Sequence, residues 1–413
     1  MQTSRRRVAA VENGNRKHKP DYVLLLLCIL LLSIGLIVVY AISPGLSKQR
    51  NVSENYFVGK QLTAIALGII AFTITSQIPT QLWRKMEKPL LYIAGAASVA
   101  VRLFGERVNG AYRWIQVGGL SFQAAELIKF ALLIWLAGFL SNRIREGQIA
   151  NFEKTLKPLL IVLAIIGVVV AKVQSDLGST GVMVAIMASM VYVAGLPLKR
   201  IAMIGGIIAI GTTLLISSTS YRRDRFATFM NPSRDCQTTG YQACQALIAV
   251  GSGGVVGLGL GKGVQAYGYL PEAANDSIFA IFAEKFGFIG VTILLGLFLA
   301  FFTRLKNIIE RAPDLYSRFL VVGVLAWLST QTLINIGAMI GLLPLKGITL
   351  PFISYGGTSL VFITAAIGVV FQISRYTSYS ISNIQDAEEK HRENITDGRR
   401  FRGAYRPGSR SSS

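Results

Sequence analysis

The sequence predicts an all-α integral membrane protein with ten transmembrane helices and a long extracytoplasmic loop between the seventh and the eighth. Its composition points to lipid as the solvent, because 52% of the 413 residues are hydrophobic and only 15% are charged. Mean hydropathy is positive, at +0.50. Apolar stretches long enough to cross a hydrocarbon core of about 30 Å recur along the whole chain, so a single signal peptide cannot explain them.

Ten apolar stretches are separated by gaps that contain polar, proline or charged residues. The predicted helices cover residues 22–40, 57–78, 89–104, 122–140, 158–173, 179–194, 201–217, 278–302, 319–341 and 360–373. The gap over residues 218–277 is much longer than the others. It therefore predicts the long loop.

Lys and Arg residues are distributed in a way that predicts the orientation of the chain. Cytoplasmic loops retain positive charge during membrane insertion. The N-terminal tail and every second gap are rich in such residues, for example Arg143 and Arg145, whereas the intervening short gaps hold fewer. Both termini are therefore expected in the cytoplasm, and the long loop is expected outside.

The formal net charge is +21, from 42 Lys and Arg against 21 Asp and Glu. The basic residues are spread over the predicted cytoplasmic loops and tails, where anionic lipids attract them. We therefore expect membrane lipids, and no nucleic acid, as partners of this charge. Residues 1–20 and 376–413 are expected to be disordered cytoplasmic tails on either side of a ten-helix membrane domain over residues 21–375.

Two of the three cysteines, Cys236 and Cys244, share the long loop. An oxidising compartment would permit a disulfide between them. A pair of free thiols fits the sequence equally well, so both alternatives stay open.

Charged residues inside an apolar span are costly, so each is expected to have a partner or a wet site. Glu126 and Lys129 are three residues apart in QAAELIK, which places both on one face of the fourth predicted helix within reach of an ion pair. A bracing role and a binding role both fit this spacing. Arg113, shortly before this helix, is either suited to bidentate contact with phosphate or a solvated loop charge.

Three further stretches gather polar residues and glycines at the predicted outer face. QSDLGST places Asp176 where capping of the sixth helix is favoured over chemistry. The glycines of GSGGVVGLGLGKG allow close backbone approach, anion-binding nests or simple flexibility. LPLKGITLPFISYGGTSL fills the last outer gap, and irregular backbone at membrane depth needs surrounding protein or water. All these stretches are expected to converge on one extracytoplasmic cavity.

The stretch GYLPEAANDSIFAIFAEKFGFIG places Glu272 and Asp276 directly before the eighth predicted helix. A carboxylate there either caps the helix, because free backbone N–H groups favour it, or accepts a proton as a general base. Arg113, Lys129 and Lys346 would make the surroundings cationic, which keeps a carboxylate ionised. We therefore favour the general base for Asp276.

Taken together, the motifs resemble those of the SEDS family of membrane-embedded peptidoglycan polymerases. They are GAYRWI, QAAELIK, QSDLGST, GSGGVVGLGLGKG, LPEAANDSIFAIFAEKFGFIG and KGITLPFISYGGTS, in the order that the family has them. The resemblance covers the whole ten-helix region and leaves out only the tails. One departure is Lys285, which stands where the family has a second Glu.

The resemblance implies that lipid II is the substrate and that the reaction is an inverting glycosyl transfer, with Asp276 as the catalytic residue. The residues expected to bind substrate are Arg113, Glu126, Lys129, Asp176, Glu272, Lys346, Ser354, Tyr355, Gly356 and Gly357. We expect no metal site made by the protein alone. A divalent cation, Mg²⁺ or Mn²⁺, is the one cofactor that could assist the pyrophosphate leaving group.

The resemblance also implies a class B penicillin-binding protein (a transpeptidase) and other division proteins as partners, in a bacterial inner membrane at the division septum. The sequence around Lys346 and Gly347 is closer to that of division polymerases than to that of elongation polymerases. An elongation-type polymerase and a lipid II flippase are the alternatives. The flippase is disfavoured because the polar stretches gather on one face and no internal repeat is evident.

Overall fold

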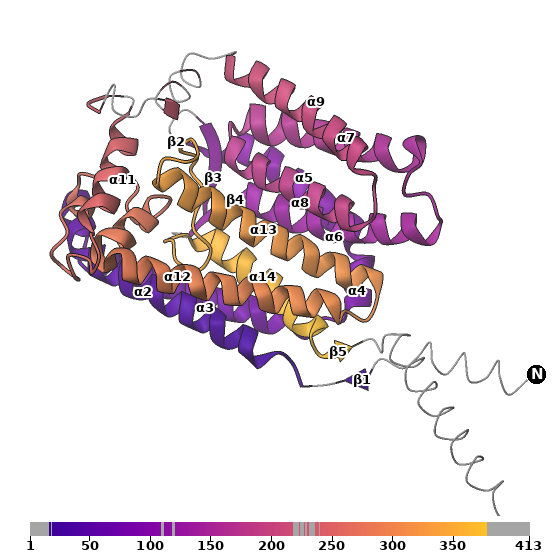
Figure 1. Cartoon of the computed structure of the whole chain (residues 1–413), viewed down its shortest axis with the longest axis horizontal. Coiled ribbons are helices and arrows are strands. Elements are labelled where there is room, and N and C mark those ends of the chain that lie inside the picture. Colours follow the sequence, from indigo (N-terminus) through magenta and orange to yellow (C-terminus); the bar gives the residue numbers. More distant parts are fainter. Residues whose placement is uncertain are drawn as a thin grey trace, which may run out of the picture.

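The computed structural model describes residues 16–17, 19–108, 111–117, 120–217, 223, 227, 229–230, 236–238 and 240–377, so most of both predicted tails lies outside the described residues. Within them the fold is mostly helical, as predicted (Figure 1). A helix lies at each of the ten predicted stretches. These helices are α2 (Tyr22–Arg50), α3 (Tyr56–Thr75), α5 (Glu87–Phe104), α6 (Ala124–Arg145), α7 (Lys157–Ile166), α8 (Leu177–Val193), α9 (Leu198–Ser217), α12 (Ile278–Glu310), α13 (Leu315–Met339) and α14 (Gly357–Ile373).

Six helices of the described part of the chain are long and apolar enough to cross a membrane. They are α2, α3, α6, α12, α13 and a helix over Phe152–Val173. The last reaches this length because π-helical turns, η1 (Phe152–Leu156) and η2 (Gly167–Val173), extend α7 at both ends. With the shorter apolar helices α8 and α14, these spans make the protein a multi-pass membrane protein.

The all-α expectation needs a correction before α6, where the chain forms a small antiparallel sheet. The strands are β2 (Glu106–Val108), β3 (Ala111–Val117) and β4 (Leu120–Gln123), in the order β2-β3-β4. The residues of β3, AYRWIQV, include the aromatic and β-branched types that favour strands, and pairing satisfies backbone groups that no helix satisfies here. The fourth predicted helix therefore begins at Ala124 and not at residue 122.

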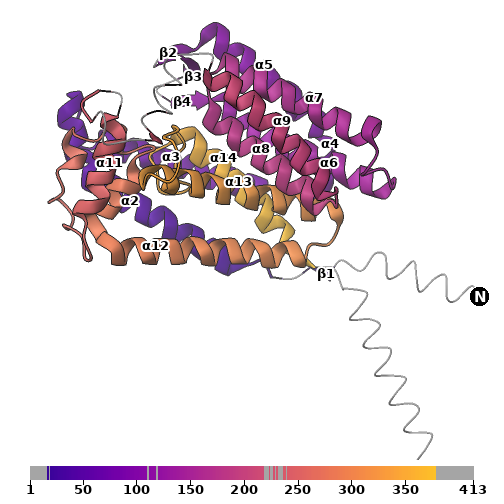
Figure 2. The same ribbon diagram turned by 45° about the horizontal axis from the view of Figure 1, so that its top comes forward.

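The helices form two groups around a central pair. α13 and α14 lie at the centre, with α5 to α9 on one side and α2, α3 and α12 on the other (Figures 1 and 2). α14 packs closely along α3: Thr75 Oγ1 donates to Ala365 O at 2.9 Å, and a Cβ on Gly368 would lie 2.0 Å from the Thr75 oxygen. Small residues allow such close approach between membrane helices.

α12 is broken at Gly287, whose φ of 62° and ψ of −165° are not helical. Four backbone groups that the break leaves without helical partners bond instead to the preceding loop. The donor and acceptor pairs are Leu258 N to Glu284 O, Gly259 N to Lys285 O, Phe288 N to Gly254 O and Ile289 N to Val255 O, at 2.9, 3.0, 2.9 and 3.1 Å. We call residues 253–259 the glycine clasp. Of the three roles considered for this loop, close backbone approach is the one that the structure shows.

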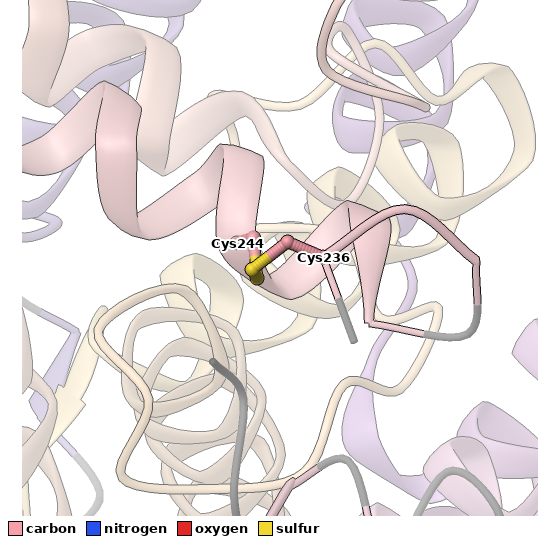
Figure 3. The surroundings of a disulfide bond; sticks show 2 residues. All are labelled: Cys236 and Cys244. Atoms are coloured by element: carbon pink, nitrogen blue, oxygen red, sulfur yellow. A yellow bond between two sulfur atoms is a disulfide. The ribbon is translucent and has the colours of Figure 1, made fainter. Parts of the chain in front are cut away.

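The loop before the glycine clasp is fastened by a disulfide. Cys236 and Cys244 are bonded, with their Cα atoms 5.6 Å apart (Figure 3), which settles the pairing that the sequence left open. Cys244 lies in the first turn of α11 (Tyr241–Ser252), and α11 packs against α12. The disulfide therefore fastens the start of the helix that leads into the clasp.

Gly257 provides a test of the clasp. Its φ is +89°, and a Cβ there would lie 2.2 Å from the carbonyl oxygen of Lys285. Gly257→Ala is expected to destabilise the protein both through backbone strain, about 1–3 kcal/mol, and through this clash. Thermal unfolding of the purified protein in detergent measures the loss.

Gly261→Ala is the matched control. Gly261 has a φ of +88°, but nothing lies within 4 Å of its Cβ position, so this variant experiences only the backbone strain. An equal fall in melting temperature for the two variants would contradict the clasp.

Candidate functional site

The turn that carries Asp276 is held through three successive carbonyl groups. The pairs are Tyr355 N to Ala274 O at 2.8 Å, Ser354 Oγ to Asn275 O at 2.6 Å and Asn335 Nδ2 to Asp276 O at 2.7 Å. The donors come from α13 and from the loop between α13 and α14, which are far from this turn in sequence. We call residues 271–277 the anchored turn.

Asp276 is half-buried and lies one residue before Ser277, the N-cap of α12. Its Oδ2 atom is 3.7 Å from the position that a Cβ on Gly347 would take. The segment 346–348 also lies against the start of α8, since a Cβ on Gly178 would be 3.4 Å from Lys346 Cβ. The structure therefore brings the carboxylate of Asp276 to the segment that contains Lys346, one of the three cations expected around it.

Glu272 lies at the other end of the anchored turn and is exposed. Its φ of +52° is left-handed, and its carbonyl oxygen accepts bonds from Asn275 N at 2.9 Å and Ser277 N at 3.2 Å. The side chain of Asn275 donates to the Glu272 carboxylate. Glu272 therefore shapes the turn, with its carboxylate at the surface.

Glu126 and Lys129 form the ion pair that their spacing predicts, with 2.7 Å between Oε1 and Nζ. Both side chains are buried. Lys129 Nζ also donates to Gln331 Oε1 at 3.3 Å and lies 5.1 Å from the ring centroid of Trp327. Buried charges need partners of this kind, so the pair braces α6 against α13.

Two amides on α13 that the sequence analysis missed connect this ion pair to the anchored turn. Gln331 Nε2 donates to Thr349 O and Thr349 Oγ1 at 2.9 and 3.1 Å. One helical turn further, Asn335 Nδ2 donates to Ile348 O at 2.7 Å as well as to Asp276 O. The available signal was two amides four residues apart in an apolar stretch, where an unpartnered polar group is costly. We call Gln331 and Asn335 the amide ladder.

Asp176 and Arg113 organise the corner between η2 and α8. Asp176 caps α8, as favoured from the sequence, because its carboxylate accepts from Ser179 N at 2.9 Å and Ser179 Oγ at 2.8 Å. Gln123 Nε2 donates to the same carboxylate at 3.3 Å. Arg113 on β3 donates to the carbonyl oxygens of the two residues before Asp176, at 3.0 and 2.6 Å. This corner lies directly before Gly178, which contacts the segment 346–348.

Ser354, Tyr355, Gly356 and Gly357 form the entry to α14. Besides its bond to the anchored turn, Ser354 Oγ accepts from Leu350 N at 2.7 Å. Burial, with a smaller contribution from Tyr56, raises the pKa of Tyr355 to about 12, so its hydroxyl stays neutral at physiological pH. Gly356 is the N-cap of α14 and Gly357 its first residue.

Comparison with known proteins gives consistent matches over nearly the whole chain. A family of cell cycle proteins, FtsW, RodA and SpoVE, matches residues 22–379. Stage V sporulation protein E of Bacillus subtilis is 38% identical over 367 residues, which cover 88% of this chain and 99% of that relative. A probable peptidoglycan glycosyltransferase FtsW of Saccharophagus degradans is 37% identical over 361 residues, which cover 86% and 92%.

Solved structures resemble the fold as a whole. RodA of Thermus thermophilus, a rod shape determining protein, matches with a TM-score of 0.63 and 26% identity over 86% of this chain and 97% of its own. A chain from a peptidoglycan synthase complex, described as coordinating polymerization and crosslinking, matches with a TM-score of 0.70 and 26% identity over 86% and 98%.

The buried ion pair predicts a large effect of removing one partner. Lys129→Ala leaves the Glu126 carboxylate buried without its cation, which is expected to cost about 3–5 kcal/mol of unfolding free energy. The added substitution Glu126→Gln removes the stranded charge and is expected to restore part of the loss. Chemical unfolding in detergent measures both.

Lys157→Ala is the control, because Lys157 pairs with Glu153 at 2.9 Å in an exposed position. Loss of that pair is expected to cost no more than about 1 kcal/mol. Similar losses for Lys129→Ala and Lys157→Ala would show that burial of the first pair has no energetic consequence.

Proposed function

Since the chain belongs to the FtsW, RodA and SpoVE family of cell cycle proteins, we propose that it polymerises lipid II into glycan strands at the division septum, with Asp276 as general base. The chain is a peptidoglycan glycosyltransferase, like its FtsW relatives. The observation that carries the assignment to Asp276 is its place on the anchored turn, half-buried beside the segment that contains Lys346.

The reaction joins two lipid-linked sugars. A hydroxyl oxygen of the acceptor attacks the anomeric carbon of the donor with inversion, the bond to pyrophosphate breaks, and the hydroxyl proton passes to the carboxylate of Asp276. Pyrophosphate leaves readily, so a second carboxylic acid in the manner of a glycosidase is not required. Fixed cations stabilise the charge that develops on the leaving group.

Lys346 and Arg113 are the cations that we propose for the pyrophosphate. Two atoms of the Arg113 guanidinium donate to backbone carbonyls, which fixes its plane. A guanidinium has five N–H donors, so the same group can also donate to phosphate oxygens. We propose that Glu126, Lys129, Asp176, Glu272, Ser354, Tyr355, Gly356 and Gly357 bind substrate or shape its site, which opens to the outer face as one cavity.

A divalent cation remains part of the proposal. Among the described residues, no group of three His, Cys, Asp or Glu side chains is placed to hold a metal ion. Mg²⁺, however, often binds through one or two carboxylates together with substrate phosphates, and the anchored turn offers the exposed carboxylate of Glu272. Mg²⁺ or Mn²⁺ bound there would neutralise charge on the pyrophosphate.

We also propose the full topology: ten spans, both termini in the cytoplasm, and residues 218–277 outside. Two observations support it. Asp21, at the start of α2, is bonded through its backbone N–H to Ser374 and through its carboxylate to Arg304, so both ends of the described chain leave from one end of the helices (Figure 2). The disulfide in the long loop suits an oxidising compartment. The membrane domain of this proposal is residues 21–375, with a tail on either side.

The partner proposed for this enzyme is a class B penicillin-binding protein, together with other division proteins. A polymerised glycan needs crosslinking. One of the similar structures comes from a complex that coordinates polymerization and crosslinking. The inner membrane at the septum is the proposed location.

Asp276→Asn tests the catalytic assignment. An amide cannot accept the proton, so glycan polymerisation from lipid II by the purified variant is expected to fall by about 10²- to 10⁴-fold, with folding and lipid II binding retained. The control is Glu310→Gln, the same loss of charge at an exposed site near the other end of α12. Polymerisation by Asp276→Asn at the wild-type rate would falsify the assignment.

Single cysteines test the topology. Lys262 and Lys306 are exposed, and the native cysteines are either buried or in the disulfide. A membrane-impermeant maleimide added to spheroplasts is expected to label Lys262→Cys at once, and Lys306→Cys only after the membrane is permeabilised. The opposite order of labelling would invert the proposed orientation.

A further inference from the structure

Asn335 contacts both segments that flank the carboxylate of Asp276. It lies on α13 and is 1% exposed. Its side-chain nitrogen donates to Asp276 O and to Ile348 O, each at 2.7 Å. One amide group therefore joins residues that are 72 positions apart, since it lies 59 residues after Asp276 and 13 residues before Ile348.

The carbonyl group that Asn335 holds belongs to the residue directly before Ser277, the N-cap of α12. Two N–H groups in the first turn of α12, those of Ala280 and Ile281, bond to the carbonyl oxygen of Ser277 at 3.1 and 3.4 Å. Asn335 thus holds the peptide group directly before the one to which these two N–H groups bond. Because that peptide group shares its Cα atom with the Asp276 side chain, its orientation sets the direction in which the carboxylate leaves the backbone.

The second bond of Asn335 acts on the other side of the carboxylate. Ile348 directly follows Gly347, the residue whose backbone lies against Asp276 Oδ2. The position of this backbone therefore depends on the same amide that holds the anchored turn. Through these two bonds, Asn335 sets both the base and the segment with Lys346 that faces it.

The neighbouring bonds of the anchored turn do not duplicate this function. Ser354 and Tyr355 hold the carbonyls of Asn275 and Ala274, which are one and two residues further from the carboxylate. Asn335 holds the carbonyl of Asp276 itself. This has an energetic cost, because the Oδ1 atom of Asn335 is buried without a hydrogen-bond partner among the described residues. A buried amide that leaves its own acceptor unsatisfied calls for a role beyond packing.

We propose that Asn335 is a positioning residue for the glycosyl transfer, which orients the carboxylate of Asp276 toward the acceptor hydroxyl. The proposal rests on the proposed role of Asp276 as general base. Asn335 itself touches neither substrate nor the transferred proton. Its effect is on geometry, and an error of about 1 Å in the position of a catalytic group can lower a rate by about 100-fold.

Asn335→Leu tests the proposal, because leucine has a similar volume and no donor. We expect kcat for polymerisation of lipid II to fall by about 100-fold while KM stays within about twofold, since a contact that matters only in the transition state lowers kcat alone. We also expect faster hydrogen exchange in residues 271–277 and 346–350, but not in α6, where Lys129 lies.

Thr332→Val is the matched control on the same helix. Thr332 is also buried, but among the described residues its hydroxyl bonds only to Leu328 O of α13, at 2.8 Å. This variant is expected to keep both kcat and the exchange pattern of the wild type. If Asn335→Leu does not fold, Asn335→Ser replaces it, since serine keeps one donor: an intermediate kcat supports the proposal and a wild-type kcat overturns it.

The two variants distinguish a failure of the positioning role of Asn335 from a failure of the base assignment of Asp276. If Asp276→Asn is inactive and Asn335→Leu retains the wild-type kcat, the positioning role is overturned while the general base stands. If Asp276→Asn polymerises at the wild-type rate, the base assignment fails, and the positioning role falls with it. A fall in kcat with no change of exchange in residues 271–277 would also overturn the proposal.

Discussion

Backbone hydrogen bonding without water is the constraint on which this structure depends. Each N–H and C=O group that is buried away from water needs a partner within the protein, and a helix supplies its own. The chain leaves the helical path at the anchored turn and at Gly287. In both places the missing partners come from distant sequence, namely from Asn335 and the loop before α14 at the turn and from the glycine clasp at Gly287. The bonds that satisfy the backbone also gather Asp276 and Lys346.

The amide ladder shows how a charged pair and a carboxylate are connected across a membrane helix. Gln331 accepts from Lys129 and donates to Thr349, and Asn335 donates to the carbonyl of Ile348, the residue directly before Thr349. An amide carries both donors and an acceptor but no net charge. It can therefore link charged groups at low dielectric without the desolvation cost of a further ion.

Much of this arrangement could be predicted from local sequence, and the rest could not for a physical reason. Apolar length locates the helices, the three-residue spacing finds the pair of Glu126 and Lys129, and an acidic residue before hydroxyls finds the cap at Asp176. The clasp and the partners of Asn335 join residues that are far apart in the sequence and that local patterns leave unconnected. These contacts depend on which segments become neighbours in the folded protein, and hydropathy and residue spacing do not encode that.

The break at Gly287 also bears on where the first part of α12 lies along the membrane normal. Residues 288–310, at about 1.5 Å a residue, extend roughly 34 Å, which is enough to cross a hydrocarbon core of about 30 Å alone. In the proposed topology, residues 288–310 would be the part of α12 that crosses the membrane. The part of α12 before the break, with Asp276 two residues ahead of its start, would then lie at the level of the outer head groups. With a lipid-linked donor, as proposed, bilayer thickness would set the distance between the pyrophosphate and that carboxylate, so the rate of the proposed reaction would depend on the lipid composition of the membrane.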